Sequence, residues 1–163
     1  MSQGLDTTKA KRRQLRFESI DDLLADVVRI IEAEQAGTLR CSGNWSAGKT
    51  LGHLAAWVTY GYEGYPFKTP PFFIRWILRR KVKQFLTKGM PAGARIPGVQ
   101  AGTYGVDELA TNEGADRLRT ALARLKTREP CPHDSPAFGR MSHDERIALN
   151  LKHAELHLGF LHP

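Results

Sequence analysis

Apolar residues recur along the chain at spacings of three and four, the period of one face of an α-helix. The clearest example follows Ser19, where aliphatic side chains form such a stripe until Gly37. Ser19 can cap this helix, and the two aspartates that follow suit the positive end of the helix dipole. The pattern therefore predicts a first helix between Ser19 and Gly37.

Four more helices follow from the same pattern. They are expected to begin at Ser46, after Pro70 and Pro71, at Asp107 and at Ser142, and to extend to about residues 63, 88, 128 and 161. Ser142 also opens a Ser-x-x-Glu capping box. The connections 89–105 and 129–139 are rich in glycine and proline. Strands do not alternate with the helices, so the sequence predicts an all-α bundle rather than a doubly wound sheet.

Length and composition predict a single domain with one core, because the chain has 163 residues, of which 41% are hydrophobic. We expect residues 1–17 to form a basic N-terminal arm and residues 18–163 a single helical domain. No transmembrane segment and no signal peptide are recognisable, so a cytoplasmic location is expected. Cys41 and Cys131 match no CxxC pattern and are expected to be free, buried thiols.

A net charge of +7 would suit an anionic partner. No nucleic-acid-binding signature is present, so nucleic acid is not expected as a partner. Residues 71–86 carry an apolar stripe between arginines and lysines. The stripe consists of Ile74, Leu78, Val82 and Phe85. Such a helix can lie on a membrane, or it can cover a bundle and expose a basic face, and we favour the second interpretation. A bundle with this flank could also form a homodimer.

Residues 43–50, GNWSAGKT, match the Gly-x-x-x-x-Gly-Lys-Thr pattern of phosphate-binding loops. Such a loop joins a buried strand to a helix. The preceding residues offer only Leu39 and Cys41 as apolar strand positions, and no aliphatic run ending in aspartate supplies a magnesium-binding partner. We therefore interpret the segment as a helix start that Ser46 caps, with Trp45 packing as a hydrophobic staple.

The spacing of three histidines indicates a shared ligand. His153 and His157 stand four residues apart, so they lie on one face of the last helix, and His53 lies on the second helix beside Trp57 and Tyr60. The last helix is apolar on two arcs, and the second helix has one apolar arc with His53 nearly opposite it. We expect both helices to be buried, and buried imidazoles need partners. Three inward imidazoles can share a divalent metal in a catalytic type of site that keeps one open position.

The spacing alone leaves open the alternative that these histidines only make hydrogen bonds. Glu155 lies on roughly the opposite side of the helix from His153, unlike the general base of a His-Glu-x-x-His protease motif. The other histidines are His133 in a loop, His143 in a capping turn and His162 at the terminus. We expect all three at the surface.

Five motifs follow one another along nearly the whole chain. They are RRQLRFES at 12–19, N-W-S-x-G-x-x-x-x-H-L at 44–54, GYPF at 64–67, PAFG at 136–139 and KHAELHLGFL at 152–161. Their order and spacing resemble the DinB/YfiT-like superfamily, and more narrowly a branch of it described as a domain of unknown function.

This resemblance implies a four-helix bundle with an additional helix, long connections and a central divalent metal. The implied ligands fall on His53, His153 and His157. Many members of the branch carry a further histidine where this chain has Leu156, a departure that leaves the three ligands intact. Characterised relatives include transferases and isomerases that use low-molecular-weight thiols. The resemblance thus implies a zinc or nickel ion that activates a thiol or water toward a small-molecule substrate.

Two functions stay open at this point. The first is a metal-dependent transferase or hydrolase, with Trp57 and Tyr60 as pocket-lining candidates and Arg75 and Lys49 as candidates for holding an anionic group of the substrate. The second is a non-catalytic, metal-stabilised binding module, since a fold does not imply a reaction.

Overall fold

A computed structural model describes residues 7–93, 95–96 and 99–163, and the first six residues of the predicted N-terminal arm lie outside these ranges. Within them the elements are α1 (Ile20–Gln35), β1 (Arg40–Cys41), α2 (Ala47–Glu63), α3 (Phe72–Lys88), α4 (Thr111–Lys126), α5 (His143–Leu158) and β2 (Leu161–His162). The predicted all-α fold is therefore confirmed. No helix in the described part of the chain is long and apolar enough to cross a membrane.

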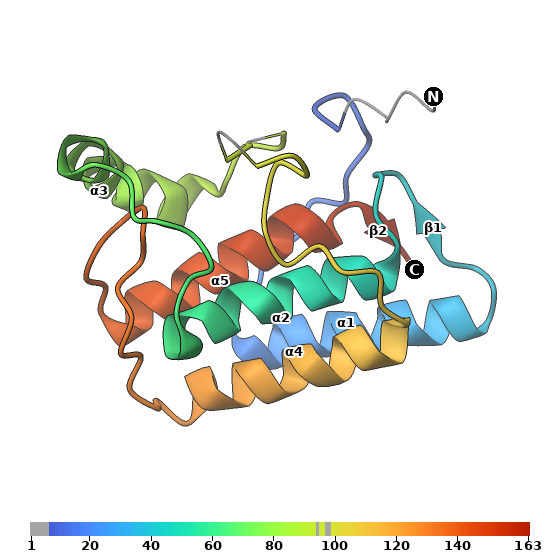
Figure 1. Cartoon of the computed structure of the whole chain (residues 1–163). Coiled ribbons are helices and arrows are strands. Elements are labelled where there is room, and N and C mark those ends of the chain that lie inside the picture. Colours follow the sequence, from blue (N-terminus) through green and yellow to red (C-terminus); the bar gives the residue numbers. More distant parts are fainter. Residues whose placement is uncertain (1–6, 94, 97–98) are drawn as a thin grey trace.

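Four helices form a bundle, and α3 lies outside it beyond α5 (Figure 1). In the bundle α1 and α5 run in one direction, whereas α2 and α4 run in the other (Figure 1). The long connection 64–110, which includes α3, returns the chain to the end where α2 began, and this makes α2 and α4 parallel neighbours. The arrangement specific to DinB/YfiT-like proteins stays a prediction.

Helix caps and apolar stripes account for the bundle elements. Ser19, Ser46 and Ser142 cap α1, α2 and α5 as predicted, and Ser142 completes its capping box with Glu145. The facing sides of the helices bury aliphatic residues, the largest of which are Leu23, Ile30, Leu51, Leu118, Leu122, Leu125 and Leu158. Burial of these stripes, rather than helix propensity, supplies most of the stability of the bundle.

Glycines allow α2 and α4 to approach each other closely. A Cβ atom added to Gly48 would overlap the carbonyl oxygen of Leu109, and one added to Gly114 would lie 2.5 Å from the carbonyl oxygen of Gly48. Because these neighbours are backbone atoms, they cannot rotate away. The close contact sets the rotation of α2 about its own axis, so that the face carrying His53 turns toward α5.

We expect Gly114→Ala to lower the free energy of unfolding by about 3 kcal/mol, because the new methyl group must push two helix backbones apart. Urea denaturation followed by circular dichroism measures this loss. Gly37→Ala is the control, since an added Cβ there meets nothing within 4 Å and only the left-handed φ of 70° is unfavourable, at about 1 kcal/mol. Equal losses in the two variants would contradict the close-packing explanation.

Two predicted helix boundaries were wrong. α4 begins at Thr111 rather than Asp107, because Leu109 packs its backbone and side chain against the glycine face of α2. α5 ends at Leu158 rather than near residue 161, because the chain turns and β2 pairs antiparallel with β1. A two-residue strand whose partner lies far away in the sequence leaves no local pattern.

The cysteines are free, as predicted, but the prediction that both are buried was wrong. Cys41 is exposed on β1, and Cys131 is half-buried in the connection before α5. Leu161, opposite Cys41 in the strand pair, takes the buried position instead.

The outer helix α3 has two apolar faces. Val82 is buried, and Ile74, Leu78 and Phe85 line a cavity between α3 and the bundle, so the predicted stripe does cover the bundle. A second apolar group, which the sequence analysis did not single out, is exposed: Phe72, Phe73, Trp76 and Ile77. The favoured interpretation, in which α3 exposes only a basic face, is therefore incomplete.

Candidate metal centre

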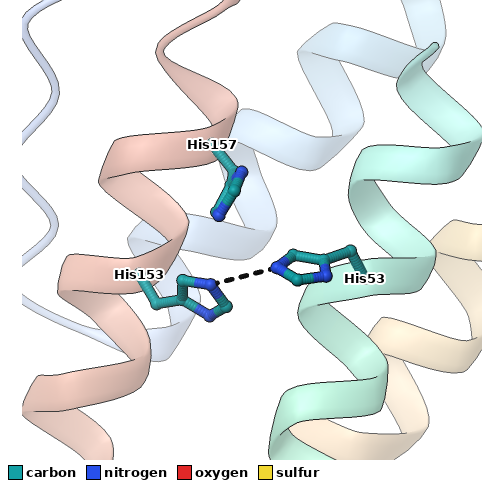
Figure 2. Close-up of side chains that lie close together, drawn as sticks. All are labelled: His53, His153 and His157. Atoms are coloured by element: carbon teal, nitrogen blue, oxygen red, sulfur yellow. Dashed lines mark hydrogen bonds between the residues drawn. The ribbon is translucent and has the colours of Figure 1, made fainter. Parts of the chain in front are cut away.

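Three histidines from two helices come together between α2 and α5 (Figure 2). Their candidate ligand nitrogens lie within 4.8 Å of one another, and the ring of His53 lies 5.0 Å from that of His153 and 4.6 Å from that of His157, between centroids. The four-residue spacing places His153 and His157 on one side of α5. His53 points at them from α2, which runs antiparallel beside α5.

A backbone carbonyl sets the orientation of the His53 ring. The Nδ1 atom of His53 lies 2.9 Å from the carbonyl oxygen of Tyr104, which can only accept a hydrogen bond. Nδ1 therefore carries the hydrogen, and Nε2 presents its lone pair to the other two rings. Metal-binding histidines usually have such a carbonyl or carboxylate behind them, because it fixes the tautomer and the ring plane.

One pair of nitrogens already has the separation that a small divalent ion requires. The Nε2 atoms of His53 and His153 are 3.2 Å apart, close enough to share one hydrogen. Two imidazole nitrogens on a tetrahedral zinc ion, each about 2.0–2.1 Å from the metal, are separated by about 3.3 Å. An ion could therefore replace this hydrogen bond with little movement of either ring. Three imidazoles without a carboxylate are a donor set that zinc, nickel and copper accept.

Burial keeps the three imidazoles neutral. His53 is 1% exposed, and burial lowers its pKa to about 4, although hydrogen bonds to the backbone of Tyr104 and Gly105 partly oppose the shift. Burial also lowers the pKa of His153 and His157 well below the usual range, and mutual repulsion within the cluster adds to this. Both side chains keep some exposed surface because part of each ring faces the cavity. A neutral imidazole is the form that binds a metal.

We expect the metal-free protein to lose stability as the pH falls from 7 to 5. The unfolded chain takes up a proton on each histidine near pH 6.5, whereas folded His53 resists protonation down to about pH 4. The unfolded state therefore binds more protons in this window, and the free energy of unfolding falls by about 2 kcal/mol for His53 alone. Urea titrations of chelator-treated protein at several pH values measure the slope. If a His53→Gln variant kept the same dependence of the free energy of unfolding on pH, His53 would not be its cause.

Two tryptophans enclose the histidines. Trp45 stacks flat on His157 with 5.2 Å between ring centroids and meets His53 edge-on, so it packs across onto α5 rather than as the predicted staple within α2. Trp57 places its ring 5.8 Å from that of His153. Its Nε1 is buried and has no hydrogen-bond partner among the described residues. A buried donor without a partner is unfavourable by about 1–3 kcal/mol, unless a ligand accepts its hydrogen bond.

The histidines face the large cavity between α2, α5 and α3. Its volume is about 1360 Å³, and its wall is mostly apolar. Of the two pocket-lining candidates, Trp57 is part of this wall. Tyr60 packs behind it, 6.0 Å from the Trp57 ring, with its hydroxyl group toward Gly105. The cavity exceeds the size of drug-sized ligands and can hold a small molecule against the histidines.

The candidates for binding an anion lie apart from the histidines. Lys49 makes an ion pair of 2.5 Å with Glu108 in the connection before α4. Arg75 lines a smaller recess of about 300 Å³ beside Tyr65 and His133. The Gly-Lys-Thr pattern is not built as a phosphate loop, because the preceding strand is the exposed two-residue β1 and Lys49 is engaged elsewhere. The interpretation of this segment as a capped helix start is confirmed.

The remaining histidines are placed as follows. His133 is exposed, as predicted. The surface prediction was wrong for the other two, which are half-buried: His143 binds the carbonyl oxygen of Leu125 at 2.7 Å, and His162 lies 3.0 Å from the hydroxyl oxygen of Ser42. Each has a partner of its own, so neither competes for a shared ligand.

Sequence reasoning missed two residues at the site. The carbonyl of Tyr104 comes from an irregular loop and leaves no signal in the sequence. Arg146 lines the cavity from α5, and its position seven residues before His153, on the same helix face, could have revealed it.

Comparison with known families finds one match over almost the entire chain. Residues 9–163 match the family described as "Protein of unknown function (DUF1569)", and the chain belongs to this family. No curated protein and no solved structure matches the chain. The function must therefore be argued from the geometry of the site.

Proposed function

We propose that this member of the DUF1569 family binds a divalent metal ion, zinc or nickel, through His53, His153 and His157, and that it is a metal-dependent enzyme acting on a small molecule. One observation carries the proposal: three imidazoles, one buried and two half-buried, converge from two helices at the wall of a large, mostly apolar cavity. The motif resemblance to DinB/YfiT-like proteins supports the same three ligands and adds a low-molecular-weight thiol as the candidate co-substrate.

The chemistry of such a centre follows from the donor set. When bound by three neutral histidines, a divalent ion keeps an open position and lowers the pKa of a thiol or water placed there. The residues of the chain supply the rest. The carbonyl of Tyr104 holds His53 in the binding tautomer, Trp45 fixes the plane of His157, and the apolar wall around Trp57 limits the access of water. The reaction class is transfer or hydrolysis.

Cobalt substitution tests for the open position. Co²⁺ bound to the metal-free protein gives visible absorption bands that report its coordination. A thiol such as cysteine that enters the open position should add a sulfur-to-cobalt charge-transfer band. Saturable growth of this band supports the proposal. Cobalt binding without any response to thiol or to anions would refute a catalytic type of site.

A metal with a purely structural role is the second candidate. It is favoured by the origin of the ligands, because an ion shared by α2 and α5 would hold the two antiparallel helices together at the bundle centre. In that case metal binding should raise the melting temperature, and thiols and anions should leave the cobalt spectrum unchanged. The two candidates therefore differ in the thiol response, not in metal content.

A further inference from the structure

One face of α5 carries a row of polar side chains along the cavity. Arg146, Asn150, His153 and His157 follow one another at spacings of four, three and four residues, and all four line the cavity. With a rise of 1.5 Å per residue, the backbones of Arg146 and His153 are separated by about 10 Å along the helix. A guanidinium group and the three-histidine centre thus stand at two points of one cavity.

Arg146 is a buried cation without an acidic partner. Its residue is 9% exposed, and its Nη2 atom donates a hydrogen bond of 2.8 Å to the carbonyl oxygen of His133. In the described part of the chain no carboxylate lies within ion-pair distance of its guanidinium group, whereas the partly buried Arg13 has Asp26 at 2.7 Å. A buried charge is costly unless an opposite charge compensates it.

The neighbours of Arg146 place its guanidinium group in the wall of the cavity. Gly61 lies directly beside the guanidinium group, since an added Cβ there would be 3.3 Å from Nη1. Tyr65 is the polar neighbour: burial raises the pKa of its phenol, and the charge and hydrogen bonding of Arg146 oppose that rise. Gly61 and Tyr65 both line the cavity. Arg146 therefore contributes a cation to the cavity wall rather than to the exposed surface.

We propose that Arg146 binds the carboxylate group of an elongated, apolar small molecule whose other end reaches the three-histidine centre. A planar guanidinium matches a carboxylate, and its single charge compensates the single charge of a carboxylate in a wall that is mostly apolar. Trp57, Leu149 and Phe67 supply apolar wall for the body of the molecule. The claim that the other end of the molecule reaches the three-histidine centre rests on the proposed function. The claim that Arg146 binds a carboxylate does not.

Metal-free protein tests the subsite on its own. Octanoate, whose chain spans about the required length, is compared with uncharged octanamide by isothermal titration calorimetry. We expect wild type to bind octanoate at least about tenfold more tightly, since charged hydrogen bonds in an apolar site have this effect. Arg146→Gln should remove the preference, because octanoate binding falls much more than octanamide binding. Equal affinity of wild type for the two probes would overturn the proposal.

Two controls exclude a structural effect of the substitution. Arg128→Gln removes an exposed arginine that pairs with Asp144, and it should keep the octanoate preference. Arg146→Lys keeps the charge but loses the planar fork, and it should retain only part of the preference. Octyl phosphate is the third probe. If it depended more strongly than octanoate on Arg146, the assignment to a carboxylate would be wrong.

Cobalt-loaded protein then tests whether one ligand contacts both Arg146 and the three-histidine centre. A probe with both groups, 8-mercaptooctanoate, is compared with 1-octanethiol through the sulfur-to-cobalt band. The carboxylate should tighten binding at least about tenfold in wild type and not in Arg146→Gln. If neither thiol gives the band, the proposed function fails while the octanoate result stands. If both give it with equal affinity, the distance argument fails and the metal site stands.

A second inference rests on the outer face of α3. Phe72, Phe73, Trp76 and Ile77 are 83%, 54%, 55% and 48% exposed and follow one another at spacings that place them on one side of the helix. Large apolar side chains grouped at the surface mark interaction sites. The guanidinium group of Arg80 lies 3.4 Å above the Trp76 ring. The helix contains no acidic residue, and its cations are Arg75, Arg79, Arg80, Lys81, Lys83 and Lys88.

The charge pattern points to an anionic lipid surface as the partner of this face. On an amphipathic helix, exposed aromatic side chains enter the boundary between headgroups and acyl chains, while flanking cations bind lipid phosphates. Nucleic acid would use the cations but leave the four large apolar side chains in water. We infer that α3 seats the protein on an anionic bilayer, with the cavity directly behind it.

Vesicle sedimentation tests this surface. We expect wild type to bind vesicles of phosphatidylcholine with phosphatidylglycerol, and phosphatidylcholine alone much less. Trp76→Ser should weaken binding about tenfold, whereas Val28→Ser, at an exposed aliphatic residue of α1, should leave it unchanged. Equal binding by both variants would overturn the inference. So would binding to duplex DNA alone, or a dimer in solution that Trp76→Ser dissociates.

Discussion

Replacement of His153 by alanine is expected to abolish metal binding. Wild-type protein purified without a histidine tag should carry close to one divalent metal per chain, measured by elemental mass spectrometry. His153 is one of the three clustered histidines, and its Nε2 atom lies 3.2 Å from that of His53. Its removal leaves two imidazoles from two helices. The affinity should fall more than about a hundredfold, which exceeds the loss typical when a residue that only supports a ligand is replaced.

His133→Ala is the matched control for this experiment. His133 is exposed outside the cluster, so its loss removes a histidine without touching the site, and the metal content should stay unchanged. Circular dichroism must show that both variants fold. A wild type that takes up neither zinc nor nickel, or a His153→Ala variant with full metal content, would refute the three-histidine site. His53, His153 and His157 would then be buried histidines that only make hydrogen bonds.

Asp26→Ala is expected to cause a large loss of stability far from the cavity. Asp26 on α1 is fully buried and accepts two hydrogen bonds from Arg13, of 2.9 and 2.7 Å, and Arg29 lies 3.2 Å away. Arg13 also donates to the carbonyl oxygen of Leu158, so this contact joins the N-terminal segment, α1 and the end of α5. Removing the carboxylate leaves a partly buried arginine uncompensated, at about 3 kcal/mol in the free energy of unfolding.

Urea denaturation of Asp26→Ala against Asp21→Ala measures this effect. Asp21 also forms an ion pair, with Lys126 at 2.6 Å, but both side chains are exposed. Its loss should change stability by less than about 1 kcal/mol. Equal and small losses in both variants would show that Arg13 and Asp26 contribute no more than a surface pair. Asp26→Asn separates charge from volume, and it should be nearly as unstable as the alanine variant.

The metal-binding candidates could be predicted because their signals are local. A four-residue spacing places His153 and His157 on one side of any α-helix, and the two apolar arcs around them indicate burial. The same holds for the helix caps at Ser19, Ser46 and Ser142, whose side chains bond to amides within the same turn. Such features depend only on neighbouring residues, and the structure agrees with them.

Features that depend on distant segments were missed or wrong. Trp45 was expected to pack within its own helix, yet its ring stacks on His157. The start of the fourth helix was predicted four residues too early, because the sequence around Leu109 contains no signal that this residue packs on the glycines of α2. Whether Arg146 has a carboxylate partner likewise depends on the positions of acidic residues from distant parts of the chain. These positions are settled only when the helices meet.

The amino-acid sequence by itself determined the all-α class, the helix starts and the three histidines, because periodicity and capping act over a few residues. Only the tertiary structure decided that His53 lies 3.2 Å from His153 across two helices, that Tyr104 fixes its tautomer, and that a cavity opens beside them. The physical reason is that these contacts follow from the packing of whole helices, which the close approach of α2 and α4 and the long connection through α3 jointly set.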